Sequence, residues 1–389
     1  MTMGGPLDPR AYELLASEGL SPDPFNPAQH RSCELVERYA VETALDLCGR
    51  LGVLDLLHAP LTAADLCAAR GFLPEFARPL RWLLERLATA GILTRANTGY
   101  RLTGPPPRPA LAALREDALA MDVSYAPAYD LLDAAASLYP GVARGEVQAE
   151  RALFLRARLW LSYFDNANGY YALSNRVAAC AAASRLEALG GRVLEVGAGL
   201  GSATEALLGE LRTRGALGQV TGYHVTEPAL FFRRRLQRTL EESWPGIALS
   251  FDGLDINQPW SAQGVEPGSC TLVWGVNVFH LARRLDDALL KAHAALAPGG
   301  WLVVGEGLRP GAGVPVGAEL PFQLLDSFHD VLLDPDTRPT AGFLTAELWT
   351  GALRRTGFDD IALVPDVIAL RESYPGFLAA AVCGRRPSR

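Results

Sequence analysis

Residues 192–204, RVLEVGAGLGSAT, contain the pattern that decides the fold. A mostly apolar run typical of a buried strand leads directly into three glycines at alternate positions, Gly197, Gly199 and Gly201. A segment with helical spacing, SATEALLGELRTR, follows at once. Glycines between a strand and a helix permit a tight turn and let a ligand approach the backbone closely. We therefore predict a strand, a turn and a helix that together bind a ligand at the turn.

The alternation of strand and helix continues after this unit. The expected order is strand 219–226, helix 228–243, strand 247–255, strand 270–278, helix 285–297, strand 301–308, helix 345–357, strand 360–366 and strand 377–385. Such alternation predicts a parallel sheet with helices on both faces. With the first strand included, the sheet has seven strands.

The N-terminal third has a different organisation. Apolar residues recur at helical spacing in 33–59 and 75–91, and Thr62 precedes a short helical run that ends at Gly71. Two β-prone runs around ANTG (96–99) then predict a small hairpin. Three helices followed by a hairpin is the order of a winged helix. Winged helices often bind DNA. A domain that dimerises or covers the substrate has the same pattern, and we favour this interpretation.

The pattern divides the chain into three expected domains. Residues 1–110 form the mostly helical, winged-helix-like domain, which opens with an irregular lead-in over 1–30 and closes at the linker GPPPRP. Residues 111–187 are expected to be a helical lid or linker region. Residues 188–389 hold the alternating strands and helices.

Composition limits the function classes. The 389 residues carry a formal net charge of −7, which argues against a dedicated nucleic-acid binder. No apolar run reaches about 18 residues, and the first residues lack a secretory signal pattern, so we expect a cytoplasmic protein with no membrane partner. Six cysteines without paired spacing predict free thiols and no metal site.

Three acids stand at the ends of successive predicted strands: Glu195, Glu227 and Asp255. A carboxylate just before the glycines can hold a cationic amino group. One after the second strand can accept two ribose hydroxyls, and one after the third can accept an adenine amino group. The set suits S-adenosylmethionine better than a dinucleotide, because the G-x-G-x-x-G spacing is missing. A solvated loop carboxylate is the alternative for each acid alone.

Several longer motifs resemble a known family. They occur in the order VLEVGAGLGSAT, GYHVTEPALFF, LDINQPWSAQGVEPGS, NVFH and LAPGGWLVVGEG. Over roughly residues 163–383 the chain is similar to the C-methyltransferase domains of polyketide synthases, within the class I S-adenosylmethionine-dependent methyltransferases. The resemblance implies a Rossmann-like seven-stranded methyltransferase sheet and a role in natural-product biosynthesis. The N-terminal third resembles the winged-helix region of small-molecule O-methyltransferases.

The resemblance also implies site residues. The cofactor-binding residues expected from it and from the glycine turn are Glu195, Gly197, Gly199, Gly201, Glu227, Asp255, Ile256 and Asn277. Asn277 has two alternatives, since it can orient the acceptor or only cap the backbone. His280 matches the catalytic histidine of the family, and Glu306 matches the glutamate that pairs with it.

The chemistry of a histidine at a strand end supports this assignment. We expect His280 to end the fourth strand and Glu306 the fifth. Neighbouring parallel strands lie about 4.8 Å apart, and their carboxyl ends face one ligand crevice. A histidine near neutral pKa can take a proton from carbon, and an acceptor on its second nitrogen fixes the tautomer. A structural histidine at the strand boundary is the alternative.

The acceptor is expected to meet an aromatic, polar lid. The substrate residues predicted are Tyr163, Asn166, Tyr170, Tyr171, Phe328 and His329. Their polar tips can hydrogen-bond an enolate oxygen. Helix packing on the core explains the segment at 163–176 equally well. The four arginines of FFRRRLQR (231–238) suit either an acidic carrier protein or a solvated helix face.

Three functions fit these residues. The first is C-methylation of a β-dicarbonyl-type carbon on a small molecule or a carrier-protein-bound acyl chain. The second is O- or N-methylation of a free small molecule. The third is a methyltransferase-like protein that does not methylate, either a cyclase that retains the cofactor or a regulator. We expect the N-terminal domain to pack against the catalytic core or to form a homodimer with a second copy.

Overall fold

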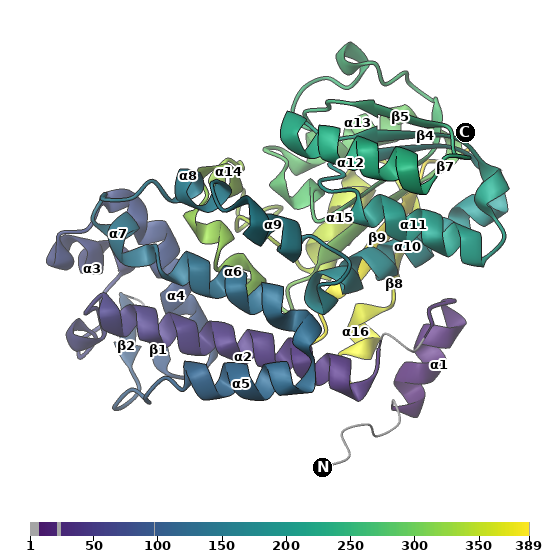
Figure 1. The fold of residues 1–389 in the computed structure, drawn as a ribbon. Helices are drawn as coiled ribbons and strands as arrows, with labels where there is room; N and C mark the ends of the chain where they lie inside the picture. The colour runs from purple at the N-terminus through teal and green to yellow at the C-terminus, as the bar shows by residue number, and fades with distance from the viewer. Residues whose placement is uncertain (1–7, 22–24, 97, 389) are drawn as a thin grey trace. The chain divides into compact units, whose positions relative to one another are not determined.

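A computed structural model describes residues 8–21, 25–96 and 98–388. The chain divides into two compact units (Figure 1). The sheet unit comprises Met1–His30, Phe164–Pro310 and Val331–Arg389, and the helical unit comprises Arg31–Tyr163 and Gly311–Asp330. These units do not follow the boundaries expected after residues 110 and 187, and the three-domain division stays a prediction.

The sheet unit is built on seven hydrogen-bonded strands. They are β3 (Gly191–Val196), β4 (Val220–Thr226), β5 (Leu249–Asp252), β6 (Cys270–Val276), β7 (Leu296–Gly307), β8 (Asp359–Val364) and β9 (Ala379–Arg385). Its helices are α1 (Pro9–Ser17), α10 (Gly169–Leu189), α11 (Ser202–Thr213), α12 (Leu230–Ser243), α13 (Leu285–Ala295), α15 (Ala346–Arg355) and α16 (Val367–Leu370). The predicted seven-stranded α/β sheet is therefore confirmed.

The order of the strands places the ligand crevice. Across the sheet the order is β5-β4-β3-β6-β7-β9-β8. The chain begins at the central strand β3, adds β4 and β5 on one side, and then returns to place β6 on the other side of β3. Ligands of such sheets bind at this switch point, beyond the carboxyl ends of the strands. The central strands are buried along almost their whole length, which indicates that both faces are covered.

Two details differ from the sequence prediction. The last strand, β9, is antiparallel to β7 and to β8, whereas periodicity alone predicted a parallel sheet. The expected irregular lead-in contains the helix α1, because Asp8 caps it by accepting from the backbone of Arg10 and Ala11. Residues 1–7 and 22–24 of that lead-in lie outside the described residues.

The helical unit begins with the predicted three helices and hairpin. Its elements are α2 (Pro27–Arg50), which starts just before the unit, α3 (Ala63–Arg70), α4 (Ala77–Thr89), β1 (Leu93–Ala96), β2 (Gly99–Leu102), α5 (Leu111–Met121), α6 (Ala126–Ala136), α7 (Tyr139–Ala143), α8 (Ala149–Phe154), α9 (Ala157–Tyr163) and α14 (Asp326–His329). Thr62 and Asp65 form a capping box on α3, and Gly71 ends it at φ 66°. The predicted turn residue Asn97 lies outside the described residues.

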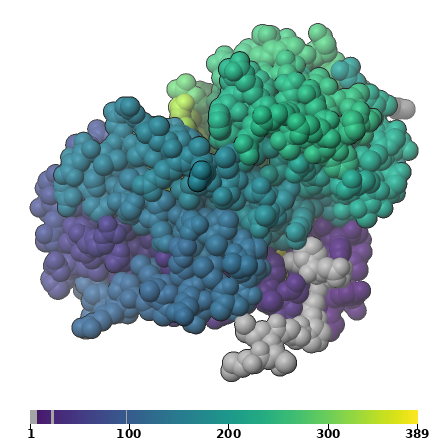
Figure 2. Space-filling view, in the orientation of Figure 1, coloured from purple at the N-terminus to yellow at the C-terminus, as the bar shows by residue number. Residues whose placement is uncertain are grey.

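Segments distant in sequence meet inside the helical unit. Tyr39 of α2 donates to the Asp133 carboxylate of α6 over 2.6 Å. Figure 2 shows the purple atoms of the early helices beside blue atoms from later in the same unit. The unit therefore has its own tertiary structure rather than a chain of separate helices.

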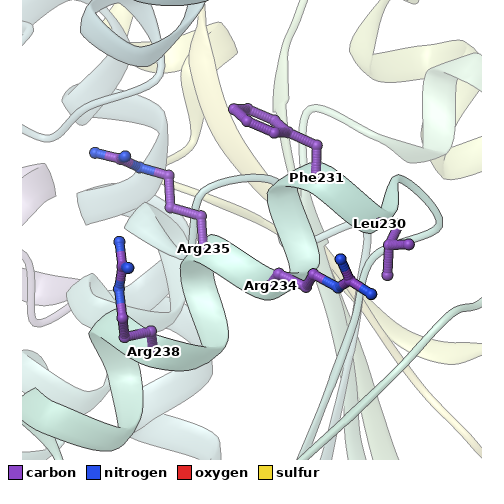
Figure 3. Close-up of a pocket in the computed structure, with 5 residues that line it drawn as sticks. All are labelled: Leu230, Phe231, Arg234, Arg235 and Arg238. Carbon is purple, nitrogen blue, oxygen red and sulfur yellow. The ribbon is translucent and has the colours of Figure 1, made fainter.

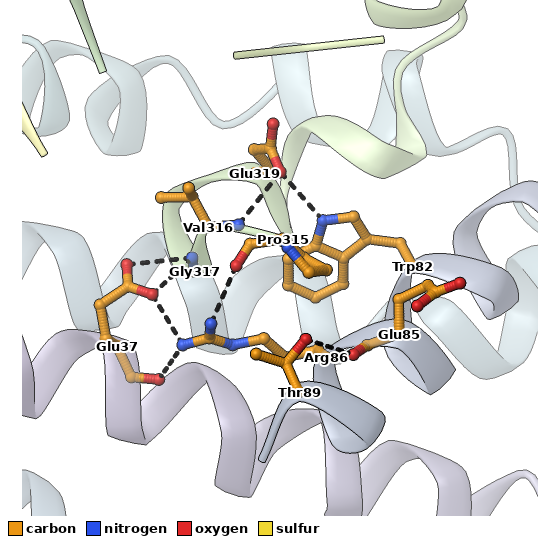
Figure 4. A network of polar contacts seen from close by, with 9 residues as sticks. All are labelled: Glu37, Trp82, Glu85, Arg86, Thr89, Pro315, Val316, Gly317 and Glu319. Carbon is orange, nitrogen blue, oxygen red and sulfur yellow. Dashed lines mark hydrogen bonds and ion pairs between the residues drawn. The ribbon is translucent and has the colours of Figure 1, made fainter. Parts of the chain in front are cut away.

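A buried ionic network holds residues 311–330 in this unit (Figure 4). The Arg86 guanidinium donates to the Glu37 carboxylate over 2.7 Å and to the carbonyl of Pro315 over 2.9 Å. The same carboxylate accepts from the backbone N–H of Gly317, and Trp82 donates to Glu319 over 3.2 Å. These bonds explain why a segment after β7 belongs with α2 and α4. Across the described ranges, the longest helices are not apolar enough to cross a membrane.

Candidate functional site

The glycine turn after β3 has the backbone that its sequence predicted. Gly197, Gly199 and Gly201 all have positive φ, at 68°, 57° and 85°. A Cβ on Gly197 would lie 2.5 Å from Val278, whereas a Cβ on Gly199 would meet nothing within 4 Å. Gly197 therefore permits tight packing, and Gly199 borders open space at the crevice. A ligand can approach the backbone at Gly199 as the motif requires.

Glu227 lies against this turn. It follows β4 directly, and its carboxylate accepts from the backbone N–H groups of Gly199 at 2.9 Å and Ala229 at 2.8 Å. The side chain is buried, and burial raises the pKa of its carboxyl group. Each carboxylate oxygen can accept more than one hydrogen bond, so Glu227 still has acceptor capacity for the two ribose hydroxyls predicted to bind there.

Glu195 is not a solvated loop carboxylate. It is buried on β3, where one carboxylate oxygen accepts from Thr204 at 2.8 Å and from the Tyr223 hydroxyl at 2.6 Å. Trp274 of β6 donates in turn to the Tyr223 oxygen over 2.9 Å. Burial raises the pKa of Glu195 to about 7. Its other oxygen has no hydrogen-bond partner among the described residues, which suits the cationic amino group that the sequence predicted for this site.

Asp255 and Ile256 lie in a loop rather than at a strand end. The strand β5 ends at Asp252, three residues before Asp255. The exposed Asp255 carboxylate accepts from the backbone N–H of Asn257 at 2.8 Å, so it forms a local turn. Lys291 of α13 donates to the carbonyls of Ile256 and Asn257 at 3.0 and 2.9 Å. The single lysine of the chain thus fixes the loop expected to surround the adenine.

Asn277 has a left-handed backbone at the end of β6, with φ 54°. Its backbone N–H donates to the carbonyl of Gly305 over 2.8 Å, and its side-chain oxygen has no hydrogen-bond partner among the described residues. A non-glycine residue in this region costs roughly 1–3 kcal/mol and is common at functional sites. Backbone capping alone does not explain that buried oxygen.

His280 and Glu306 form a buried pair. His280 lies in the short 3₁₀ helix Phe279–Leu281, four residues after β6 ends at Val276, and not on the strand itself. Its Nδ1 lies 2.7 Å from Oε2 of Glu306, and its backbone N–H donates to the other carboxylate oxygen over 3.3 Å. Glu306 is fully buried on β7, the parallel neighbour of β6. The strand order therefore brings together two residues 26 positions apart.

The residues predicted for the acceptor fall into two groups. In the sheet unit, Asn166 donates to the carbonyl of Ser202 at 2.7 Å and accepts from Asn175 at 2.9 Å, so it is fixed at the start of α11. Tyr170 lies in the first turn of α10, and the Tyr171 ring packs against Phe164. This group lies beside the cofactor turn through Ser202.

The second group lies in the helical unit. The rings of Tyr163 and Phe328 both pack on Phe322, at centroid distances of 6.4 and 5.8 Å. His329 packs against Phe328, and its Nε2 lies 3.0 Å from the carbonyl of Gln323. Burial lowers the pKa of His329 and raises that of Tyr163. These three residues form one aromatic cluster, and their contact with an acceptor stays a prediction.

The arginine-rich helix α12 has two different faces. Arg233 donates to the carbonyl of Glu227 over 2.7 Å and so supports the cofactor turn. On its outer surface a pocket is lined by Leu230, Phe231, Arg234, Arg235 and Arg238 (Figure 3). The three arginines of this pocket make no ion pair with any residue in the described part of the chain. Docking of an acidic carrier protein on this face stays a prediction.

Sequence reasoning missed several residues around the pair and the cofactor turn. Thr204, Tyr223 and Trp274 bind or support Glu195, and Arg338 donates to the carbonyl of His280. Thr204 and Tyr223 lie inside the motifs VLEVGAGLGSAT and GYHVTEPALFF, which do not indicate their roles, whereas Trp274 and Arg338 lie outside the quoted motifs. Tyr223 and Trp274 were visible only as apolar strand positions.

The chain is similar to a methyltransferase family model and to polyketide synthases. Residues 194–302 match the family model described as a methyltransferase domain. The chain is 34% identical over 182 residues to the highly reducing polyketide synthase otaA of Aspergillus niger, which covers 45% of this chain and 7% of that protein. It is 29% identical to the polyketide synthase ThaQ of Burkholderia thailandensis over 74% of this chain and 14% of that protein. The chain thus spans a small fraction of the length of these relatives.

Solved structures share the fold. The CurJ carbon methyltransferase superposes with a TM-score of 0.76 at 23% identity, covering 98% of this chain and 100% of that one. The trans-methyltransferase CalH, solved in complex with SAH, gives a TM-score of 0.63 at 20% identity, over 92% of each chain. Residues 194–302 therefore contain a methyltransferase domain, and the chain shares the fold of these solved methyltransferases. More closely, its sequence is similar to parts of polyketide synthases, and its fold is similar to that of a carbon methyltransferase.

Proposed function

We propose that this methyltransferase C-methylates an activated carbon between two carbonyl groups, with His280 as general base and Glu306 as its partner. The observation that carries the proposal is the 2.7 Å contact between Nδ1 of His280 and the buried Glu306 carboxylate. A carboxylate at Nδ1 favours the tautomer whose basic lone pair is on Nε2, and it stabilises the imidazolium that forms. A carbon acid needs such a base, because its C–H proton must leave before the carbon can attack.

The cofactor would be held by the residues around the glycine turn. Gly199 offers open space, Glu227 lies at that turn, and Glu195 has an oxygen without a partner among the described residues. When bound, S-adenosylmethionine supplies a methyl group that its sulfonium already activates. The chain therefore has to position the acceptor and to hold its proton, which is the part that the His280–Glu306 pair can perform.

The acceptor that we propose is a β-ketoacyl thioester, either free or bound to a carrier protein. The carbon methyltransferase named in the CurJ structure and the polyketide synthases among the relatives support this class. The alternative is O- or N-methylation of a free small molecule, for which the helix and hairpin order at the N-terminus is the supporting observation. A cyclase that retains the cofactor is the other alternative.

One assay separates these functions. The protein is incubated with labelled S-adenosylmethionine and a panel of β-ketoacyl thioesters, phenols and amines, and the methylated atom is located by NMR. We expect the label on the carbon between the two carbonyls. Label on oxygen or nitrogen would favour the second function, and a cyclised but unlabelled product would favour the third.

A further inference from the structure

A loop between α14 and α15 covers the His280–Glu306 pair. Within the sheet unit, the backbone N–H of Leu332 donates to the carbonyl of Arg283 over 2.8 Å, just after the 3₁₀ helix that contains His280. The Phe343 ring packs on the His280 ring at a centroid distance of 4.8 Å. Between these two contacts lies Arg338. The loop thus places a cation beside the pair.

The backbone that presents Arg338 is tightly built. The N–H and carbonyl groups of Asp334 and Arg338 bond to each other over 2.9 Å in both directions. The Asp334 carboxylate accepts from the backbone N–H groups of Asp336 and Thr337 and from the Thr337 hydroxyl. A turn closed in this way presents Arg338 with little backbone freedom, as a preorganised binding group requires.

The guanidinium of Arg338 is buried and only partly used. The residue is 4% exposed, and one Nη donates to the carbonyl of His280. Its Nε and its other Nη have no hydrogen-bond partner among the described residues. Within those residues it makes no ion pair, although the negative charge of Glu306 acts on it. Desolvation lowers the pKa of Arg338 to about 10, so the group stays charged at neutral pH.

Glu306 does not satisfy these donors, because neither of them lies within hydrogen-bonding reach of its carboxylate, whose two oxygens bind His280. A buried cation with unused N–H donors is destabilising unless a water, an ion or a ligand completes its hydrogen bonds. The ligand must offer an oxygen with negative charge, since a guanidinium fork matches that group in geometry and sign.

We propose that Arg338 forms an anion-binding subsite for the acceptor oxygen that becomes negative when His280 removes the proton. In this step the C–H bond of the acceptor breaks, its proton moves to Nε2 of His280, and the electron pair is delocalised onto the adjacent carbonyl oxygen. The unused donors of Arg338 bind that oxygen. The substrate class is an enolisable dicarbonyl compound, and this inference rests on the proposed function.

Proton exchange tests the subsite without any methyl transfer. An N-acetylcysteamine thioester of 3-oxobutanoic acid is incubated with protein in D₂O in the absence of S-adenosylmethionine, and NMR follows loss of the C2 protons above the rate without enzyme. We expect Arg338→Met to slow the enzymatic exchange by ~10²–10³, the usual effect of removing an oxyanion donor. Arg338→Lys keeps a charge but loses the fork, so a smaller loss of about tenfold is expected.

Two controls separate the possible failures. Arg355→Met removes an arginine of α15 whose Nε and one Nη donate to the Asp286 carboxylate, and it should exchange at the wild-type rate. His280→Ala should abolish the enzymatic exchange. Absence of His280-dependent exchange in the wild type would overturn the proposed function. If exchange depends on His280 but Arg338→Met exchanges at the wild-type rate, the subsite alone is overturned. If Arg338→Met does not fold, a wild-type rate in Arg338→Lys has the same meaning.

Discussion

Nδ1 of His280 lies 2.7 Å from Oε2 of Glu306, and both side chains are buried. Glu306 lies near the end of β7, and His280 lies four residues after the end of its parallel neighbour β6, whose Val276 is paired with Gly305 of β7. This register places Glu306 one residue beyond the last pair and leaves His280 room to turn back in a 3₁₀ helix. The contact therefore follows from the topology of the sheet and not from a local motif.

Cofactor binding should depend on the open space at Gly199. Gly199→Val places a branched side chain in that space and should abolish measurable S-adenosylmethionine binding in calorimetry. Gly215→Val is the matched control, because Gly215 also has positive φ, at 69°, and nothing within 4 Å of its Cβ. Both variants suffer the same kind of backbone strain, so unchanged affinity in Gly199→Val, or equal loss in both, would contradict the assignment.

Glu195 should make stability depend on pH. Its folded pKa of about 7 is raised by burial above the value of 4.5 for an unfolded carboxyl. The protonated form is therefore favoured in the folded state. Its contribution to the free energy of unfolding is fully present below pH 4.5 and is lost as the pH rises through 7. The loss is about 3 kcal/mol, from 2.5 pKa units at 1.36 kcal/mol each.

Denaturant unfolding at pH 5 and pH 8 measures this dependence. Glu195→Gln cannot ionise and should show a clearly smaller difference between the two pH values, whereas Glu241→Gln on the exposed face of α12 should match the wild type. Glu18, whose pKa burial also raises to about 7, leaves a residual dependence in every variant. An undiminished difference in Glu195→Gln would show that Glu195 is not the group responsible.

The network of Arg86 and Glu37 should hold residues 311–330 in the helical unit. Arg86→Met leaves the Glu37 carboxylate without its cation in a mostly buried place, which should destabilise the local structure by about 3 kcal/mol. Hydrogen–deuterium exchange of peptides from 311–330 should rise accordingly. Arg31→Met breaks only the exposed pair with Glu34 and should leave that exchange unchanged. Equal protection of 311–330 in both variants would refute this role.

Part of the site could be predicted from the sequence, including one contact between neighbouring strands. The three glycines, the acids near strand ends and the pairing of His280 with Glu306 are predictable, because a glycine turn and successive parallel strands limit where their residues can lie. The fold class followed from the alternation of helix and strand for the same reason. The membership of residues 311–330 in the helical unit was not predictable, since it depends on Arg86 and Glu37 more than 200 positions earlier.

Arg338 shows why other features of the site and the sheet could not be predicted from the sequence. It lies 58 positions after His280 in a loop without helical or strand periodicity, and its burial arises only when that loop folds over the pair. The link from Glu195 to Tyr223 and Trp274 likewise crosses three strands. The antiparallel direction of β9 depends on how the chain connects the last two strands. An alternation of apolar and polar residues does not specify that direction.

The most direct test of the central claim is a double-mutant cycle on methyl transfer to a β-ketoacyl thioester. His280→Ala should leave S-adenosylmethionine affinity nearly unchanged and should slow transfer by ~10²–10⁴, the usual contribution of a positioned base. Glu306→Gln should slow it by no more than that. If the pair acts as a unit, the double variant should be little slower than His280→Ala. Wild-type turnover in His280→Ala, or strictly additive losses in the double variant, would contradict the account.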